Sequence, residues 1–332
     1  MPSFSWQHRQ RPIVCLAPMA GVTDASYRQL IKTLAPNVVV YSEFLSTDAL
    51  AYNGKKTMSM MHFDPALERP FIVQIFGKRP EHFLAAAKVV EQMGADGIDI
   101  NMGCPAAKVV SSSHGSALIK NPDLAAELVA ATVKAVSIPV SVKTRLGWDT
   151  KETLIPFCTK LIEAGASALA VHGRTFNDHF GGKADWEPIY ELKRQVSVPV
   201  IGNGDIFSAA DAVAKLGNLD GVMIGRGTIG NPWLMKEICA AFAAMDNGKL
   251  KMEDEVSGAL TMQEKLPVIL EHCRLAVKVK GEQRGMMEMR RHLAGYVKGF
   301  PGAAELRAKL VRVESMSEVE AILGTVCQLV RS

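Results

Sequence analysis

The 332-residue sequence lacks several patterns that mark whole classes of protein. Its six cysteines are scattered without a CxxC pair, which argues against a disulfide framework and a structural zinc site. HExxH motifs and paired carboxylate clusters are also missing, so a metal hydrolase or a glycosidase has little support. We therefore expect no metal, and we interpret most of the cysteines as small buried hydrophobic residues.

Long apolar runs are missing as well. No stretch of about 18 uncharged apolar residues occurs, and residues 1–11 are polar with a basic end, which is a poor match to a signal peptide. We therefore expect a cytoplasmic protein that acts as a monomer and makes no membrane contact.

The charge is nearly balanced, with a net value of +4, but it is unevenly placed. Residues 263–332 hold 12 Lys and Arg against 8 Asp and Glu, which accounts for the whole excess. A basic end segment favours a polyanionic partner, although an ordinary solvated surface has the same composition.

Residues 13–235 alternate short apolar, β-branched runs with longer segments of helical period. Nearly continuous apolar runs are typical of parallel strands that are buried on both faces. The strand-like runs are residues 13–19, 38–43, 71–76, 97–102, 140–145, 168–172, 198–203 and 221–225. The clearest helical segments between them are residues 80–93, 122–136, 152–164 and 208–216.

Eight such units over about 220 residues predict an α/β fold of the (β/α)8 TIM barrel class. An open doubly wound sheet is the alternative, but it would more often begin with a glycine-rich phosphate turn. The first run instead ends in Ala17-Pro18-Met19-Ala20-Gly21, which is no such fingerprint.

The chain changes character after about residue 255. Residues 262–280, 284–298, 304–312 and 315–329 show helical spacing without strands between them, and the Gly-Phe-Pro-Gly sequence at 299–302 separates two of these helices. We therefore predict a catalytic barrel in residues 1–250 and a helical domain in residues 251–332, with a linker near 247–260.

Polar and special residues gather where the predicted strands end. In a barrel these ends meet at one rim, where function collects. The residues are Pro18 and Met19, Gln74, Asn101 and Cys104, Lys143 and Arg145, His172 and Arg174, Asn203 and Asp205, and Gly225 and Arg226.

The last two strand ends favour phosphate binding. In residues 202–205 and 224–227 the glycines let backbone N–H groups approach an anion closely, and Arg226 can bind it with two donors. Ordinary turn glycines beside a surface arginine are the alternative.

Lys143 is predicted to point inward from an apolar strand, and a buried lysine needs an anionic partner. Reduced flavin has negative charge near N1 and O2 and is one such partner. A core carboxylate is the other. Gln74 has an amide donor and acceptor that match the polar edge of the same ring system.

Cys104 lies between Gly103 and Pro105 at the predicted rim, which favours a catalytic thiol over a buried structural one. A thiol acts as a nucleophile or as a general acid, and no dedicated His/Asp partner is evident, which favours the acid. His172 is a candidate base but suits phosphate binding at least equally. His114 belongs either to the surface or to the substrate site.

These motifs resemble those of the tRNA-dihydrouridine synthases, most closely the bacterial B-type subfamily. The resemblance covers nearly the whole chain. It is carried by residues 17–24 (APMAGVTD), 99–105 (DINMGCP), 142–147 (VKTRLG), 171–175 (VHGRT), 201–206 (IGNGDI), 289–294 (MRRHLA) and 298–302 (KGFPG).

The resemblance implies FMN at the rim, NADPH as electron donor, and tRNA as substrate. Hydride would pass from flavin N5 to uracil C6, and Cys104 would protonate C5. The residues implied to hold FMN are Pro18, Met19, Ala20, Gln74, Lys143, His172, Asn203, Gly204, Asp205, Gly225 and Arg226. The residues implied to meet the target base and its backbone are Asn101, Arg145 and Arg174.

Basic residues of the helical region are then expected to hold the tRNA backbone. They are Arg274, Lys278, Lys280, Arg284, Arg290, Arg291 and Lys298. Three positions depart from the family pattern. Ser111–Ser113 stand where relatives often have basic residues. Gly295 precedes Tyr296 where an aromatic residue is common, and we expect it to loosen that helix or its RNA contact. Tyr27 replaces a frequent phenylalanine with little expected consequence.

Two other functions fit part of the sequence. An FMN barrel that reduces a free small molecule would explain the rim but not the basic helical region. A non-catalytic RNA-binding protein on a barrel that has lost its activity would explain the helical region, but Cys104 and Lys143 argue against it.

Overall fold

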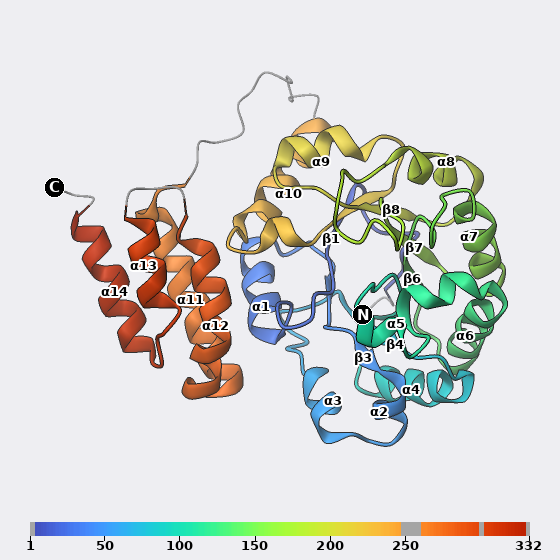
Figure 1. Ribbon diagram of the computed structural model, residues 1–332, viewed down its shortest axis with the longest axis horizontal. Coiled ribbons are helices and arrows are strands. Elements are labelled where there is room, and N and C mark those ends of the chain that lie inside the picture. Colours follow the sequence, from blue (N-terminus) through green and yellow to red (C-terminus); the bar gives the residue numbers. More distant parts are fainter. Residues whose placement is uncertain (1–3, 247–259, 299–301, 330–332) are drawn as a thin grey trace.

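The computed structural model describes residues 4–246, 260–298 and 302–329 (Figure 1). A sheet of parallel strands forms the centre of the larger part. The strands are β1 (Ile13–Leu16), β2 (Val40–Tyr41), β3 (Leu45–Ser46), β4 (Phe71–Phe76), β5 (Gly97–Met102), β6 (Val140–Arg145), β7 (Ala168–His172), β8 (Val200–Asn203) and β9 (Gly221–Ile224).

The predicted TIM barrel is confirmed. The hydrogen-bonded order runs β1-β9-β8-β7-β6-β5-β4-β2, and β3 pairs with β4. The two ends of this order meet, because Cys15 of β1 and Val39 beside β2 form a parallel bridge. The sheet therefore closes on itself, and the carboxyl ends of its strands face one rim.

The second predicted strand, residues 38–43, is wrong in its bounds. Tyr41 pairs with Ile72 and Leu45 pairs with Ile75, so four steps along β2–β3 oppose three along β4. The extra residue is a bulge that splits the strand in two. Because of this bulge, Glu43 and Phe44 leave the ladder at the rim.

Two other strands are shorter than predicted because of proline. The first was predicted to reach residue 19, but β1 ends at Leu16, and Pro18 has no N–H to continue the ladder. The seventh was predicted to begin at residue 198, but Pro199 delays the start of β8 to Val200.

Helices surround the sheet in Figure 1, and the four that we predicted are confirmed by α4, α6, α7 and α9 within two residues at each end. The helices of the barrel are α1 (Ala25–Leu34), α2 (Thr47–Ala51), α3 (Lys55–Met60), α4 (Pro80–Gln92), α5 (Ala107–Val110), α6 (Pro122–Ala135), α7 (Leu154–Glu163), α8 (Glu187–Gln195), α9 (Ala209–Leu216) and α10 (Trp233–Asp246), with 3₁₀ turns η1 (Gly115–Lys120) and η2 (Arg226–Thr228).

Alternate residues of each strand face the barrel interior or the helices. Val14 and Leu16 pack outward in the large core beneath the helices, whereas Ile13 and Cys15 join a separate cluster inside the barrel. Buried Trp6 belongs to this inner cluster. On β5 and β6 the side chains that face the barrel interior are polar. The interior below the rim therefore contains groups that can form hydrogen bonds.

Residues 260–298 and 302–329 form a bundle of helices beside α1, which we call the helical domain (Figure 1). Its helices are α11 (Met262–Lys280), α12 (Glu282–Tyr296), α13 (Ala303–Leu310) and α14 (Met316–Leu329). The four predicted helices are thus confirmed, and they share a core that includes Met286, Leu293 and Leu310. The predicted linker lies almost wholly in residues 247–259, outside the described residues.

Tyr27 and Gly295 lie where the helical domain meets the barrel. The Tyr27 hydroxyl is buried and donates to the carbonyl of Thr228 at 2.5 Å, and its ring stacks on His292 at 4.9 Å. The expectation that Tyr27 has little consequence is therefore wrong. A Cβ at Gly295 would lie 3.0 Å from the Cα of Gly230, so the missing side chain at Gly295 permits close packing of the two backbones.

Among the described residues, no helix has the length and hydropathy that crossing a bilayer requires.

Candidate active site

A cavity of about 300 Å³ opens at the carboxyl ends of the strands. It brings together most of the predicted site residues. Those that line it are Pro18, Met19, Ala20, Asn101, Cys104, Lys143, Arg145, His172, Asn203, Gly204, Asp205, Gly225 and Arg226. Gln74 and Arg174 do not line it, because each is buried behind the wall with its polar groups bound to protein.

A chain of buried hydrogen bonds lies below the cavity. Ser141 and Gln74 both donate to the carboxylate of Asp99 at 2.7 Å, and the Asn101 amide donates to the Gln74 side-chain oxygen at 2.8 Å. Burial raises the pKa of Asp99 to about 6. Because both ends of its amide are engaged, Gln74 orients Asn101 in this structure.

Asn101 in turn fixes the turn that carries Cys104. Its side-chain oxygen accepts hydrogen bonds from the backbone N–H groups of Gly103 at 3.2 Å and Cys104 at 2.9 Å. On the other side, Ser116 donates to the Cys104 carbonyl at 3.0 Å. Gly115, with φ of +60°, has no room for a side chain, since a Cβ would lie 2.9 Å from the Cys104 carbonyl oxygen.

The surroundings of the Cys104 thiol favour its protonated form. Burial raises its pKa above the ordinary thiol value, although the backbone at Ala106 and the charges of Arg145 and Lys143 oppose the rise. A neutral thiol at the cavity wall is a proton donor rather than a thiolate nucleophile. The two nearby cations would stabilise the thiolate that remains after proton transfer.

Lys143 lines the cavity from the interior face of β6. Its ammonium donates to the Asn203 side-chain oxygen at 3.0 Å, and Asn203 donates in turn to the carbonyl of Met223 at 2.8 Å. Burial, and then the charge of Arg145, lower the pKa of Lys143 to about 8. The amine has no carboxylate partner within ion-pair distance among the described residues, and it is therefore available to an anionic ligand.

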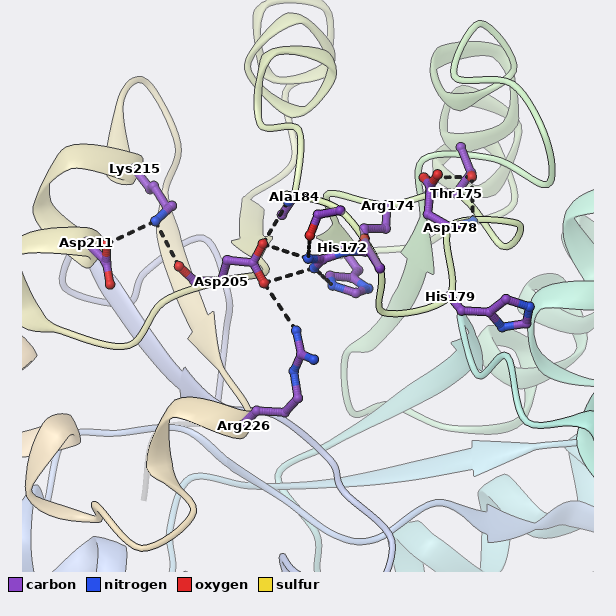
Figure 2. Close-up of polar contacts among 12 residues, drawn as sticks. His172, Arg174, Thr175, Asp178, His179, Ala184, Asp205, Asp211, Lys215 and Arg226 are labelled. Atoms are coloured by element: carbon purple, nitrogen blue, oxygen red, sulfur yellow. Dashed lines mark hydrogen bonds and ion pairs between the residues drawn. The ribbon is translucent and has the colours of Figure 1, made fainter. Parts of the chain in front are cut away.

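A neighbouring part of the cavity wall is an arginine-rich corner around Asp205 (Figure 2). Arg174 binds the Asp205 carboxylate through both terminal nitrogens at 3.0 and 2.7 Å, and Arg226 reaches it at 3.1 Å. Arg226 is half-exposed, whereas the Arg174 side chain is buried and also donates to the carbonyls of Gly181 and Gly182.

Backbone geometry at this corner depends on glycine. Gly204 has φ of +130°, and a Cβ there would lie 2.8 Å from the side chain of Ala184. A Cβ at Gly227 would lie 2.2 Å from the carbonyl oxygen of Ile206. Glycine is therefore required at both positions by packing against the protein itself, and the phosphate site stays a prediction.

His172 lies between Lys143 and this corner and is uncharged. Burial first, and then the positive charges of Lys143 and the neighbouring arginines, lower its pKa to about 2. Its Nε2 lies 3.4 Å from Nη1 of Arg174, which can only donate, so Nε2 is the acceptor of the neutral ring and Nδ1 carries the proton. The cavity as a whole has an excess of positive charge, because Lys143, Arg145 and Arg226 face a single carboxylate, that of Asp205.

Comparison with known proteins identifies the family. The profile described as "Dihydrouridine synthase (Dus)" matches residues 15–330. The chain belongs to the dihydrouridine synthase family. It is 39% identical over 313 residues to a "Probable tRNA-dihydrouridine synthase 1" of Synechocystis sp., covering 93% of this chain and 85% of that protein.

A second relative supports the predicted subfamily. "tRNA-dihydrouridine synthase B" of Pseudomonas aeruginosa is 39% identical over 302 residues, covering 90% of this chain and 88% of that protein. Among solved structures, histamine dehydrogenase from Rhizobium sp. 4-9 shares the barrel fold, with a TM-score of 0.51 at 15% identity. That match covers 79% of this chain and 48% of the other.

Several residues that line the cavity were not predicted from the sequence. Phe44, Phe180 and Phe207 line the cavity, and the latter two expose about half of their surface. The centre of the Phe180 ring lies 5.4 Å from the guanidinium of Arg145 and 5.1 Å from that of Arg226. In the sequence, each of these three residues is simply an aromatic residue in a loop after a predicted strand. Such residues are common, so this pattern alone does not predict a site.

The residues implied to meet the target base form hydrogen bonds with the protein itself. Arg145 is buried and donates to the carbonyls of Gly103, Thr175 and His179 at 2.8 to 2.9 Å. Only its cavity-facing edge is left for a ligand. In the described part of the chain, no group of His, Cys, Asp or Glu side chains is arranged to hold a metal ion.

Proposed function

We propose that this protein is a tRNA-dihydrouridine synthase that uses FMN and NADPH to reduce the 5,6-double bond of uridines in tRNA. The observation that carries the proposal is that Cys104 and Lys143 line one cavity at the carboxyl ends of the strands. Burial raises the pKa of the Cys104 thiol, which favours its protonated form. Family membership supports uridine as the target, because the relatives are named tRNA-dihydrouridine synthases.

FMN fits the cavity on the grounds of charge and shape. Its phosphate suits the corner formed by Gly204, Gly225 and Arg226, where glycines admit close approach of the backbone. The negative edge of the reduced ring suits the ammonium of Lys143, which donates to Asn203 but has no carboxylate partner in the described part of the chain. Pro18 to Ala20, His172, Asn203 and Asp205 complete the proposed binding set. Gln74 belongs to it through the orientation of Asn101 rather than by a contact seen here.

FMN held by these residues would supply a hydride for uracil C6, with NADPH as the source of that hydride. The protein must then supply the second hydrogen. Cys104 donates its proton to C5, so that one hydride and one proton saturate the double bond and the thiolate is left beside Arg145 and Lys143. Water later returns the proton to the thiol.

The chain of buried hydrogen bonds below the cavity would align the Cys104 thiol with the uracil ring. Asn101 holds the turn of Cys104 and is itself held by Gln74 and Asp99. We propose that the remaining polar edges of Asn101 and Arg145 contact the uracil ring, and that Arg174 acts from behind the wall by fixing Asp205. Near-attack geometry of this kind supplies much of an enzyme's rate enhancement.

The uridine must leave its stack to reach the cavity, as in other enzymes that modify bases. We propose that exposed basic side chains of the helical domain hold the tRNA backbone beside the rim. Arg274, Lys278, Arg284 and Lys298 are exposed, whereas Lys280, Arg290 and Arg291 donate to other parts of the protein.

Two measurements test the proposal. Purified protein should show the visible absorption of a bound flavin, and tRNA from cells that lack the gene should lose dihydrouridine at a defined position by mass mapping. A protein that takes up no FMN, or a deletion strain with unchanged dihydrouridine, would overturn it. An enzyme for a free small molecule would bind FMN and leave the tRNA unchanged.

A further inference from the structure

The helical domain docks on the two barrel segments that form one side of the cavity. One segment is residues 17–24, whose members Ala17 to Ala20 line the cavity. The other is residues 225–230, whose members Gly225 to Gly227 line it. On the first segment, Lys280 binds the carboxylate of Asp24, and Arg291 donates to the carbonyl of Gly21 at 3.1 Å. On the second, Gly295 packs on Gly230.

The first segment is a compact turn whose end is held from both sides. The Met19 N–H donates to the Thr23 hydroxyl at 2.9 Å, and the Thr23 N–H donates to the Met19 carbonyl at 3.0 Å. Asp24 then uses one carboxylate oxygen to cap α1, accepting from the Tyr27 N–H at 2.9 Å. Its second oxygen binds Lys280, which also binds Glu288 of the helical domain; Glu288 has a second cationic partner in Arg284. The carboxylate of Asp24 therefore connects residues 17–24, helix α1 and the helical domain.

The pair of Lys280 and Asp24 is better shielded than an ordinary surface ion pair. Only 10% of the Lys280 side chain and 16% of the Asp24 side chain are exposed. Burial by itself would raise the pKa of Asp24, but the charge and hydrogen bond of Lys280 hold it well below its usual range. Removal of Lys280 would leave a largely buried carboxylate without its cation, which is costly.

We propose that Lys280 and Arg291 are positioning residues for the flavin site. They hold the 17–24 loop from the helical domain, so that FMN binding depends on the docking of that domain. The domain thereby shapes the cavity in addition to any contact with RNA. This inference rests on the proposed function only in taking FMN as the ligand of the cavity.

The test measures the FMN dissociation constant of the apoprotein by fluorescence titration. Lys280→Met removes the cation and keeps most of the side-chain length. It should raise the dissociation constant about tenfold, a change well above the error of such titrations. Lys309→Met is the matched control, because Lys309 pairs with Glu305 on the exposed face of α13, away from the barrel. It should bind FMN like the unaltered protein.

A double variant separates positioning from a general loss of structure. Asp24→Asn keeps the oxygen that caps α1 but removes the unpaired charge, so Asp24→Asn/Lys280→Met should bind FMN more tightly than Lys280→Met alone. If Lys280→Met does not fold, Arg291→Met serves in its place. It removes one exposed donor to Gly21 and should raise the dissociation constant about threefold.

The outcomes distinguish this inference from the proposed function. If the unaltered protein binds no FMN, both the proposed function and this inference are overturned. If it binds FMN, and Lys280→Met loses thermal stability but keeps the same dissociation constant as Lys309→Met, the role of Lys280 is only structural. In that case the inference is overturned and the proposed function stands.

Discussion

The side-chain oxygen of Asn101 accepts a hydrogen bond from the backbone N–H of Cys104 at 2.9 Å. This contact fixes the thiol-bearing turn to β5, and through the Asn101 amide it connects that turn to Gln74 and Asp99. The position of the proposed proton donor is therefore set by a side chain three residues earlier.

Asn101→Ala should lower kcat by about 10- to 100-fold, because a small displacement of an aligned group is costly in rate. Asn101→Asp is the informative companion, since it keeps the acceptor for Cys104 and loses the donor to Gln74. Single-turnover oxidation of reduced flavin by tRNA gives the rates. If Asn101→Ala turned over at the wild-type rate, the turn that carries Cys104 would keep its conformation without the Asn101 side chain.

Cys104→Ala should retain the flavin spectrum and slow dihydrouridine formation by about 100-fold or more, which is the usual range for loss of a general acid. Cys239→Ala is the control, because Cys239 lies on α10 and packs against the hydrophobic core away from the cavity. It should leave turnover unchanged. Dihydrouridine formed at an undiminished rate by Cys104→Ala would exclude the proton-donor role.

Lys143→Met should weaken FMN binding by about tenfold or more and make the flavin harder to reduce, because the cation beside its negative edge is lost. The pH dependence has a definite sign. Burial lowers the pKa of Lys143 to about 8, so the apoprotein loses this charge as the pH rises through 8. FMN affinity should fall in the same range.

Fluorescence titration of FMN between pH 7 and 9.5 checks this prediction. Lys143→Met should abolish the fall in affinity, whereas Lys151→Met, which removes an exposed lysine paired with Asp185, should preserve it. A pH profile that is the same in Lys143→Met and the unaltered protein would assign the fall to another group.

Much of the barrel follows from period and composition, because strands buried on both faces have continuous apolar runs. Inward residues were also predictable, since alternation places Lys143 on the interior face of β6. By the same alternation Asp99 and Ser141 share that interior, and a stricter use of the period-two pattern would have predicted the polar chain below the cavity.

What the sequence did not reveal depends on contacts between distant segments. The bulge that turns Phe44 into the cavity arises from the pairing of β2 and β3 with β4, which no local pattern encodes. Lys280 and Arg291 were expected to bind RNA because they are basic, but their partners, Asp24 and Gly21, lie more than 250 residues away in the chain.

Gly295→Ala should destabilise the contact between the helical domain and the barrel, because its Cβ would lie 3.0 Å from the Cα of Gly230. Gly324→Ala is the matched control, since Gly324 is also helical but has no atoms within 4 Å of a Cβ. The control should gain up to about 1 kcal/mol from helix propensity. Thermal unfolding should show opposite shifts, and equal shifts would mean that the contact tolerates a methyl group.

Acid should separate the helical domain from the barrel through its buried histidines. Burial lowers the pKa of His292 from an ordinary 6.5 to about 4, and that of His272 well below its usual value. Both rings lie against Tyr27, with Asp24, Lys280 and Arg291 as the charged groups nearby.

The folded state thus keeps His292 neutral where the unfolded chain binds a proton. As the pH falls from about 6.5 to about 4, only the unfolded state gains this proton, so stability should fall by up to about 3 kcal/mol from His292. Denaturant unfolding at pH 7.5, 6 and 5 measures the slope. His292→Gln should be less stable at pH 7.5 yet lose less on acidification, whereas the exposed His8→Gln should follow the unaltered protein. An equal slope in all three proteins would place the acid sensitivity elsewhere.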